Sequence, residues 1–443
     1  MFVFYFFITH TFYRLSLDIA AVERFELLNS GYWATNAVST IDSLLSNHLS
    51  EVAIAMDTLS TNIQFTHDSY DEQQIQCALE VLVLAGGTRR DLESFDQKTR
   101  DRLRVLAGRM EADAEMESSL DDTSGVSALP DSLSASEIET FIAKAVCTVG
   151  YDSATSPKAE LLRLSQSSKA GTAVLLFPDS VESLARLIKS CQSFVFDVCS
   201  AIPMKSLNDM TSLPIWSQGV GLWSSDTDSY GMIPQSYITQ VGEHMLDLVQ
   251  AFEPFASSSD ALQLANLAMD GIKNIALVPW KEFAVASNCV DTTDAKSITS
   301  LLSGQSFNDH VLSRNTDMLY ENEDSGQEEE DADSPSAIFC NQWLDVICSA
   351  VTGRLLERTM RINRLSPKGC EHLSVDLNYL VNVLSALGVS GHPHPLLSHV
   401  VEIIKLEPKD LQTRFLASKE TNLVPKSMQQ MEKRLALMRN VDV

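Results

Sequence analysis

The sequence predicts an all-α protein built as an elongated stack of helical bundles. In most segments apolar residues recur at steps of three and four, as one face of a helix requires. The alternation of apolar and polar residues that is typical of a strand is nowhere sustained. At 443 residues and 44% apolar composition, the chain can bury a continuous core. That length suits about two to four domains or one elongated helical array.

The first segment, residues 1–34, is an uncertain amino terminus. Its apolar run from Met1 to Ile8 has no Lys or Arg before it. The run is also far shorter than the ~20 residues that span a bilayer. We therefore predict no transmembrane insertion, and a signal peptide is the less favoured alternative.

A helical segment follows over residues 35–120. Its first helix is expected over residues 35–60, where the apolar positions form one stripe. A second helix over 71–85 is expected to break at the glycine pair 86–87, because glycine lowers helix stability. A charged helix over 91–115 completes the segment.

A helical bundle with a turn-rich end is predicted over residues 134–231, after a polar and acidic linker. Ser134 to Glu137 has the spacing of a capping box, in which two side chains satisfy free backbone amides at a helix start. Asp179 to Glu182 has the same spacing and predicts a second helix start. That helix should end before Pro203, since proline lacks an amide hydrogen.

Residues 232–320 are expected to form a helical segment with helices over 234–253 and 261–269, followed by an irregular region over 274–317. Residues 321–337 are predicted to be an acidic disordered loop. Glu328-Glu-Glu-Asp331 lies there among Gly, Ser and Pro, a composition that buries too little apolar area to offset chain entropy.

Three successive amphipathic helices predict a carboxyl-terminal helical bundle over residues 338–443. The middle helix has a signal at each end. Ser366 is a suitable N-cap for Pro367 at the first helical position, and Gly388 suits a left-handed C-terminal cap. Its apolar face is formed by Leu373, Leu377, Leu380, Val381, Leu384 and Leu387.

Five stretches of the chain carry a family likeness in their order and spacing. They are residues 233–246 (IPQSYITQVGEHML), 252–255 (FEPF), 339–344 (FCNQWL), 364–367 (RLSP) and 374–388 (SVDLNYLVNVLSALG). Together they resemble the family of subunit seven of the conserved oligomeric Golgi complex, a vesicle-tethering assembly. The likeness is good from Tyr230 to the end except over 270–336, loose over 71–231, and absent before Asn29.

The resemblance implies a helical rod of the tethering-complex type and a noncatalytic role in retrograde intra-Golgi transport. It implies a cytoplasmic protein that is peripherally associated with the Golgi membrane. The implied partners are the other subunits, notably five, six and eight, together with SNARE proteins and Rab GTPases. Since family members are longer on the amino-terminal side, it also implies that an amino-terminal part is missing and that residues 1–34 are misjoined.

The formal net charge of −26 argues against a nucleic-acid partner, because binding phosphates needs clustered Lys and Arg. It also disfavours a general grip on an anionic membrane. The eight cysteines are scattered without any Cys-x-x-Cys, which predicts free thiols and a reducing compartment.

No catalytic residue or cofactor is predicted, because no phosphate-binding loop, nucleophile elbow or His-Glu-x-x-His motif is present. The tempting metal-ligand types are Cys370, His372, His392, His394 and His399. Zinc needs four ligands that converge tetrahedrally. Histidines in loops and at helix ends are more often polar surface residues, so no metal site is predicted.

The candidate protein-interaction residues are Tyr379, Met431 and Met438. Tyr379 lies off the apolar stripe of its helix and is the better surface candidate, whereas Trp343 is expected in the core. Met431 and Met438 share one face of the final helix. Core packing is the default there, and a Met-rich face at a chain end can also be an adaptable docking surface.

Two other classes of function stay open. A helical adaptor or regulatory scaffold unrelated to the Golgi would have a similar composition, and would be distinguished by the proteins with which it co-purifies. An enzyme without a recognisable motif would need a buried cluster of titratable groups in a cleft.

Overall fold

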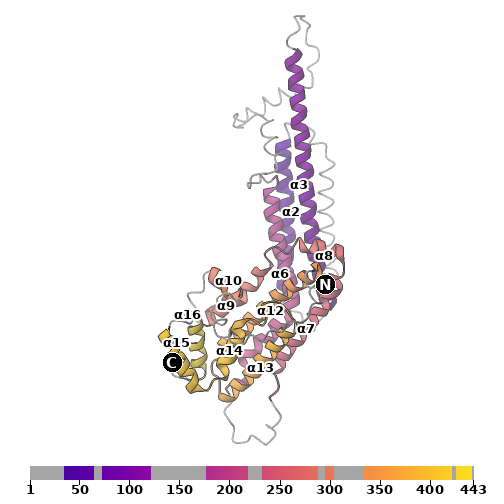
Figure 1. Ribbon diagram of the computed structural model, residues 1–443. Helices are drawn as coiled ribbons and strands as arrows, with labels where there is room; N and C mark the ends of the chain where they lie inside the picture. Colours follow the sequence, from indigo (N-terminus) through magenta and orange to yellow (C-terminus); the bar gives the residue numbers. More distant parts are fainter. Residues whose placement is uncertain are drawn as a thin grey trace, which may run out of the picture. The chain divides into compact units, whose positions relative to one another are not determined.

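The computed structural model describes residues 34–63, 72–120, 176–217, 232–287, 295–303, 334–421 and 426–441. In those ranges it contains twelve α-helices, three short 3₁₀ helices and no strand, which confirms the all-α prediction (Figure 1). The predicted amino-terminal segment, the helix start at Ser134 and nearly all of the acidic loop lie outside the described residues.

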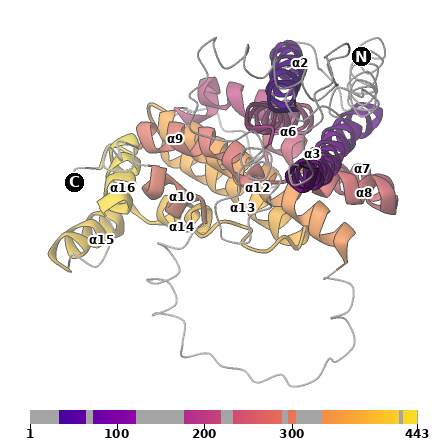
Figure 2. The ribbon, with the colours of Figure 1, turned by 90° about the horizontal axis from the view of Figure 1, so that it is seen from above.

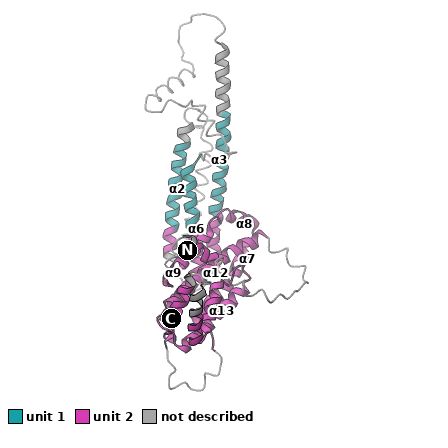
Figure 3. Cartoon of the chain, turned by 60° about the vertical axis from the view of Figure 1, so that its left-hand side comes forward, with its two compact units in different colours: residues 1–56, 84–190 teal, residues 57–83, 191–443 magenta. Residues whose placement is uncertain are grey.

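The chain divides into two compact units (Figure 3). The first comprises residues 1–56 and 84–190, and the second comprises residues 57–83 and 191–443. Three helices contribute residues to both units: α2 (Ala34–Ile63), α3 (Glu72–Leu120) and α6 (Pro178–Asn208). The segment boundaries inferred from the sequence remain predictions.

In the first unit, the start of α6 packs on α2 through short polar side chains. The Ser183 hydroxyl oxygen lies 2.9 Å from that of Ser46 and 3.2 Å from that of Ser50. Phe177, just before α6, stacks on Phe95 of α3 with ring centroids 5.1 Å apart. Serine side chains bring the two backbones close while satisfying their own hydroxyl groups.

The predicted capping box at residues 179–182 is wrong. α6 begins at Pro178, so Asp179 and Ser180 lie inside its first turn. Their backbone amides donate instead to the Asp42 carboxylate of α2, over 3.1 and 2.8 Å. Proline suits the first helical position, and the residue before it, Phe177, has no side chain that could cap the helix.

Two other predicted helix ends are also wrong. α3 continues through Gly86 and Gly87, because a glycine costs a long helix only about 1 kcal/mol. α6 continues through Pro203 to Asn208. The Asn208 side-chain oxygen accepts a hydrogen bond from Arg358, and both residues belong to the second unit. This contact stabilises the helical turn that follows the proline.

The centre of the second unit is α12 (Pro335–Arg361). It packs against α7 (Ser236–Ala256), α8 (Ser259–Asn266), η5 (Ile272–Ala276), α9 (Leu277–Ala286) and α16 (Lys426–Met438). Trp280 of α9 is fully buried and donates from Nε1 to the Ser349 carbonyl over 3.0 Å. A Cβ atom at Gly353 would lie 3.0 Å from the same ring, so glycine permits this close approach.

Trp343 is fully buried on α12, which confirms its predicted core position. The predicted irregular region contains α9 and α10 (Ala295–Ser303), so that prediction is wrong in part. α9 buries Trp280 and Phe283 but exposes Val278 and Val285. Apolar residues therefore lie on both of its faces and hide the stripe that identifies a helix.

The remaining helices of the second unit pack in pairs (Figure 2). α13 (Pro367–Ala386) packs on α14 (Pro395–Lys405), and α15 (Pro408–Thr421) packs on α16. Among the residues that the structure describes, no helix is long and apolar enough to cross a membrane.

Candidate interaction surface in the carboxyl-terminal helices

α13 has the capped ends and the apolar face that the sequence predicts. The Ser366 hydroxyl accepts a hydrogen bond from the Gly369 amide over 2.9 Å, and Gly388 has a φ of +66°. Leu380 and Leu384 are fully buried, which confirms their predicted core positions. The caps fix the ends of α13, and the buried leucines fix which of its faces is turned to the core.

Tyr379 packs against α7 rather than standing free. It is half-buried, and its ring covers Gly242 so closely that a Cβ atom at Gly242 would lie 2.6 Å from Tyr379 Cε1. The residue thus already contacts its own chain. A contact between Tyr379 and a protein partner remains a prediction.

Met431 and Met438 are both buried on α16. The Met438 carbonyl accepts a hydrogen bond from the Leu365 amide over 2.8 Å, which ties the end of α16 to the start of α13. Leu437 of α16 is 55% exposed. Docking through Met431 or Met438 remains a prediction, and it would require the helices that cover them to move.

The structure corrects the expected surface position of two histidines. The His392 and His394 side chains are buried. His392 Nε2 lies 3.0 Å from an Asp345 oxygen, and His394 Nε2 lies 2.7 Å from the Leu301 carbonyl. His394 Nδ1 accepts from the Leu396 amide, so this side chain caps α14. This cap was not predicted from the sequence, although His394 stands directly before Pro395, the first residue of α14.

Burial keeps the His394 ring neutral. It lowers the pKa of His394 to about 4, although the hydrogen bond to the Leu301 carbonyl opposes that shift. His399 contacts Glu432, with 3.2 Å between Nε2 and Oε1. Across the described residues, no group of three or more His, Cys, Asp or Glu side chains could hold a metal ion.

Buried thiols occur on several helices of the second unit. Burial raises the pKa of Cys191, Cys199 and Cys348, and these thiols are free. A thiol is a weak nucleophile compared with a thiolate, so these cysteines act as small apolar residues.

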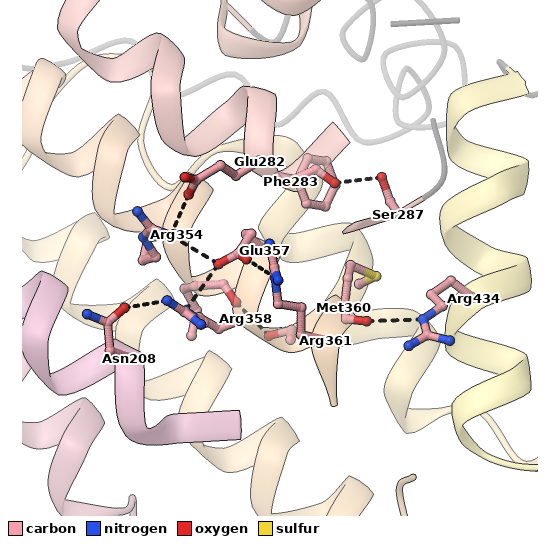
Figure 4. Close-up of polar contacts among 12 residues, drawn as sticks. Asn208, Glu282, Phe283, Ser287, Arg354, Glu357, Arg358, Met360, Arg361 and Arg434 are labelled. Carbon is pink, nitrogen blue, oxygen red and sulfur yellow. Dashed lines mark hydrogen bonds and ion pairs between the residues drawn. The ribbon is translucent and has the colours of Figure 1, made fainter. Parts of the chain in front are cut away.

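A buried carboxylate lies near the end of α12 within a group of arginines (Figure 4). Glu357 is 1% exposed. Its Oε2 lies 3.3 Å from Arg354 Nη1 and 3.2 Å from Arg358 Nε, and its Oε1 contacts Arg361 Nε. Arg354 also pairs with Glu282 of α9. Burying this carboxylate is tolerable because three guanidinium groups compensate its charge.

This arginine cluster was not predicted from the sequence. The signal was the spacing of residues 354–361, in which arginines stand three before, one after and four after Glu357. The steps of three and four place Arg354 and Arg361 beside Glu357 on a helix, whereas the contact of its direct neighbour Arg358 is seen only in the structure. This charge pattern is hard to recognise in the sequence because most other residues of the same helix are apolar and predict a core helix.

A second buried carboxylate is Asp376 of α13, for which no ion pair is found among the residues that the structure describes. It accepts hydrogen bonds from the Gln235 amide and the Tyr237 hydroxyl, both over 2.8 Å. Burial raises the pKa of Asp376 to about 6, although these two hydrogen bonds favour the charged form. Asp376 thereby links α13 to the start of α7.

The long helices packed about buried tryptophans define the chain as a helical-bundle protein. A family model described as Golgi complex component 7 (COG7) matches residues 9–274, which is more than half of the chain, and the chain belongs to this family. The match begins well before Asn29, so the expectation of no likeness there is wrong.

Curated relatives extend the match along the chain. The human conserved oligomeric Golgi complex subunit 7 is 21% identical over 429 residues, covering 91% of this chain and 46% of the human protein. The Arabidopsis thaliana subunit 7 is 24% identical over 216 residues, which are 49% of this chain and 18% of that protein. The chain thus spans about half the length of the human relative. No solved structure gives a significant match.

Proposed function

We propose that the chain is a noncatalytic subunit of a Golgi vesicle-tethering complex that acts in retrograde intra-Golgi transport by protein–protein assembly. The observation that carries this proposal is the family match over residues 9–274, together with relatives named as subunit 7 along 91% of the chain. The proposed location is the cytoplasmic side of the Golgi membrane, with peripheral association.

The proposed partners are the other subunits of the complex, notably five, six and eight, together with SNARE proteins and Rab GTPases. The helical architecture supports this proposal, because long helices offer extended surfaces in which a few anchors supply most of the binding energy. The formal net charge of the chain, −26, would steer the approach of partners with basic surfaces.

Affinity purification of the tagged full chain from cells of its source tests the proposal. The expected result is recovery of other subunits of the Golgi complex in stable proportion to the bait. An unrelated bait of similar acidity with the same tag is the control for charge-driven capture. A stable partner set without any Golgi subunit would contradict the proposal and favour a general helical adaptor.

A further inference from the structure

The end of α12 and the outer face of α9 form one arginine-bearing surface with apolar residues at its edge, where Arg361 is 51% exposed and Arg354 and Arg358 are 18% and 22% exposed. We call it the arginine surface and define it by Val278, Val285, Arg354, Arg358 and Arg361. Glu282 connects its two parts. It lies between the two valines on α9, four residues after one and three before the other, and it pairs with Arg354 of α12 (Figure 4).

The apolar part of the surface is open. Val278 is 56% exposed and Val285 is 65% exposed. The valines are seven residues apart, which places them about 10.5 Å from each other along one face of α9. Two exposed apolar side chains at that spacing match the apolar repeat of a second helix lying alongside.

The charged part is held in place before any partner arrives. Glu357 contacts all three arginines, and Arg358 is also bound to Asn208 of α6. Arg361 is 51% exposed, and its Nε atom contacts Glu357. Because this contact already restricts the side chain, less entropy is lost when the guanidinium group pairs with a partner carboxylate.

The local charge is opposite to that of the whole chain. The three arginines contact two carboxylates, Glu282 and Glu357, so the cluster keeps an excess positive charge within a chain of net charge −26. An acidic partner would be repelled by most of such a chain. It would therefore be oriented towards the arginine surface as it approaches.

From this arrangement we infer that the arginine surface binds an acidic amphipathic helix of another protein. The apolar face of that helix covers Val278 and Val285, while its carboxylates pair with Arg358 and Arg361. Arginine pairs through parallel hydrogen bonds with carboxylates and with phosphates alike, so it is the two exposed valines beside the arginines that favour a protein helix as the partner. An anionic membrane is less favoured because it would repel the acidic chain. The inference deepens the proposed function, on which it rests.

A titration of the full chain with a labelled synthetic peptide tests the inference by fluorescence anisotropy. The peptide is a helix with Leu on one face and Glu on the other. We expect binding that weakens with salt, and that weakens about tenfold, or about 1.4 kcal/mol, in Arg361→Glu and in Val285→Glu. Arg361→Gln should weaken peptide binding less than Arg361→Glu does. Thermal melts of all variants show whether a loss of binding comes from a folding defect.

The chain offers matched controls in its first unit. Arg186 is 61% exposed and pairs with Glu182, four residues before it, as Arg361 pairs with Glu357. Val105 is 55% exposed. Arg186→Glu and Val105→Glu should leave the affinity for the peptide unchanged.

Three outcomes would overturn the inference. They are absence of peptide binding, equal binding of a peptide with Lys in place of Glu, and equal loss in the control variants. Binding of phosphatidylcholine vesicles containing phosphatidylserine, lost in Arg361→Glu without peptide binding, would assign the surface to lipid instead. If Golgi subunits are recovered but the peptide does not bind, the proposed function stands and the arginine surface is wrong. If the peptide binds but no Golgi subunit is recovered, the arginine surface stands and the proposed function is wrong.

Discussion

The starts of α6 and α13 show two ways of satisfying the free backbone amides of a helix. Both helices have proline at the first position, Pro178 and Pro367. At α13, the Ser366 side chain beside the proline accepts a hydrogen bond from the first turn. At α6, the Asp42 carboxylate accepts those hydrogen bonds from a position 137 residues away in the sequence. A local cap stabilises one helix, whereas a distant cap also joins two helices.

The same division applies to other helices of the second unit. Ser334 and His394 are local caps for α12 and α14. α7 instead receives a distant carboxylate, since Asp376 of α13 accepts from the Gln235 amide at its start. We therefore expect losses at local caps to stay small, and losses at distant caps to affect helix packing as well.

The largest expected loss of stability comes from the buried core residues of α13 and not from its cap. Leu380→Ala and Leu384→Ala should each lower the free energy of unfolding by roughly 2 to 5 kcal/mol, because each removes a fully buried side chain and leaves a cavity. Tyr379→Ala should cost far less, since that ring is only half-buried. Denaturant unfolding measures the loss of stability in all three variants. A larger loss for Tyr379→Ala than for the leucine variants would contradict the observation that the leucine face of α13 is turned to the core.

Local signals were sufficient to predict α13. Ser366, Pro367 and Gly388 mark its ends within a few residues, and the spacing of Leu380 and Leu384 gives its buried face. The start of α6 could not be predicted in this way. A carboxylate such as Asp42 has no local mark that distinguishes a distant cap from an ordinary exposed residue, so the nearby capping-box spacing at 179–182 was misleading.

The pH dependence of Asp376 is the next expected effect. Its pKa is about 6 in the folded state, against an ordinary value of 3.8, so the folded state holds the proton more tightly. The stabilisation from this proton is complete below about pH 4 and is lost as the pH rises through about 6. The stability of the wild type relative to Asp376→Asn should therefore fall by about 2 kcal/mol from pH 4 to pH 7.

Unfolding titrations at the two pH values measure this difference. The matched control is Leu380→Ala on the same helix, whose penalty should not change with pH because no titrating group is removed. A relative stability that rises with pH would contradict the conclusion that burial raises the pKa of Asp376.

The interaction residues were harder to predict than the fold. Residue type and helical position pointed to Tyr379, Met431 and Met438, but Tyr379 packs on α7 and both methionines are buried. The arginine surface depends on Val278 and Val285 of α9 lying near residues 354–361 of α12. That proximity arises from the packing of helices far apart in sequence, which helical periodicity does not contain.

Removing the distant cap of α6 should have a moderate effect. Asp42→Ala leaves the buried amide and hydroxyl of Ser180 without their acceptor, which should cost about 2 kcal/mol. Thermal or denaturant unfolding measures this loss. Glu51→Ala, which removes an exposed carboxylate from the same helix, is the control and should change stability by less than about 0.5 kcal/mol. Equal losses in the two variants would mean that the Asp42 contacts contribute little.

The smallest expected effect is at the local cap of α13. Ser366→Ala removes the acceptor for the Gly369 amide and should cost about 1 kcal/mol. The Ser366 amide keeps its hydrogen bond to the Trp216 carbonyl, at 2.8 Å, so the chain path into the helix is unchanged. Ser366→Asp restores an acceptor and should recover most of the loss. A cost for Ser366→Ala as large as that of Asp42→Ala would contradict the distinction between local and distant caps.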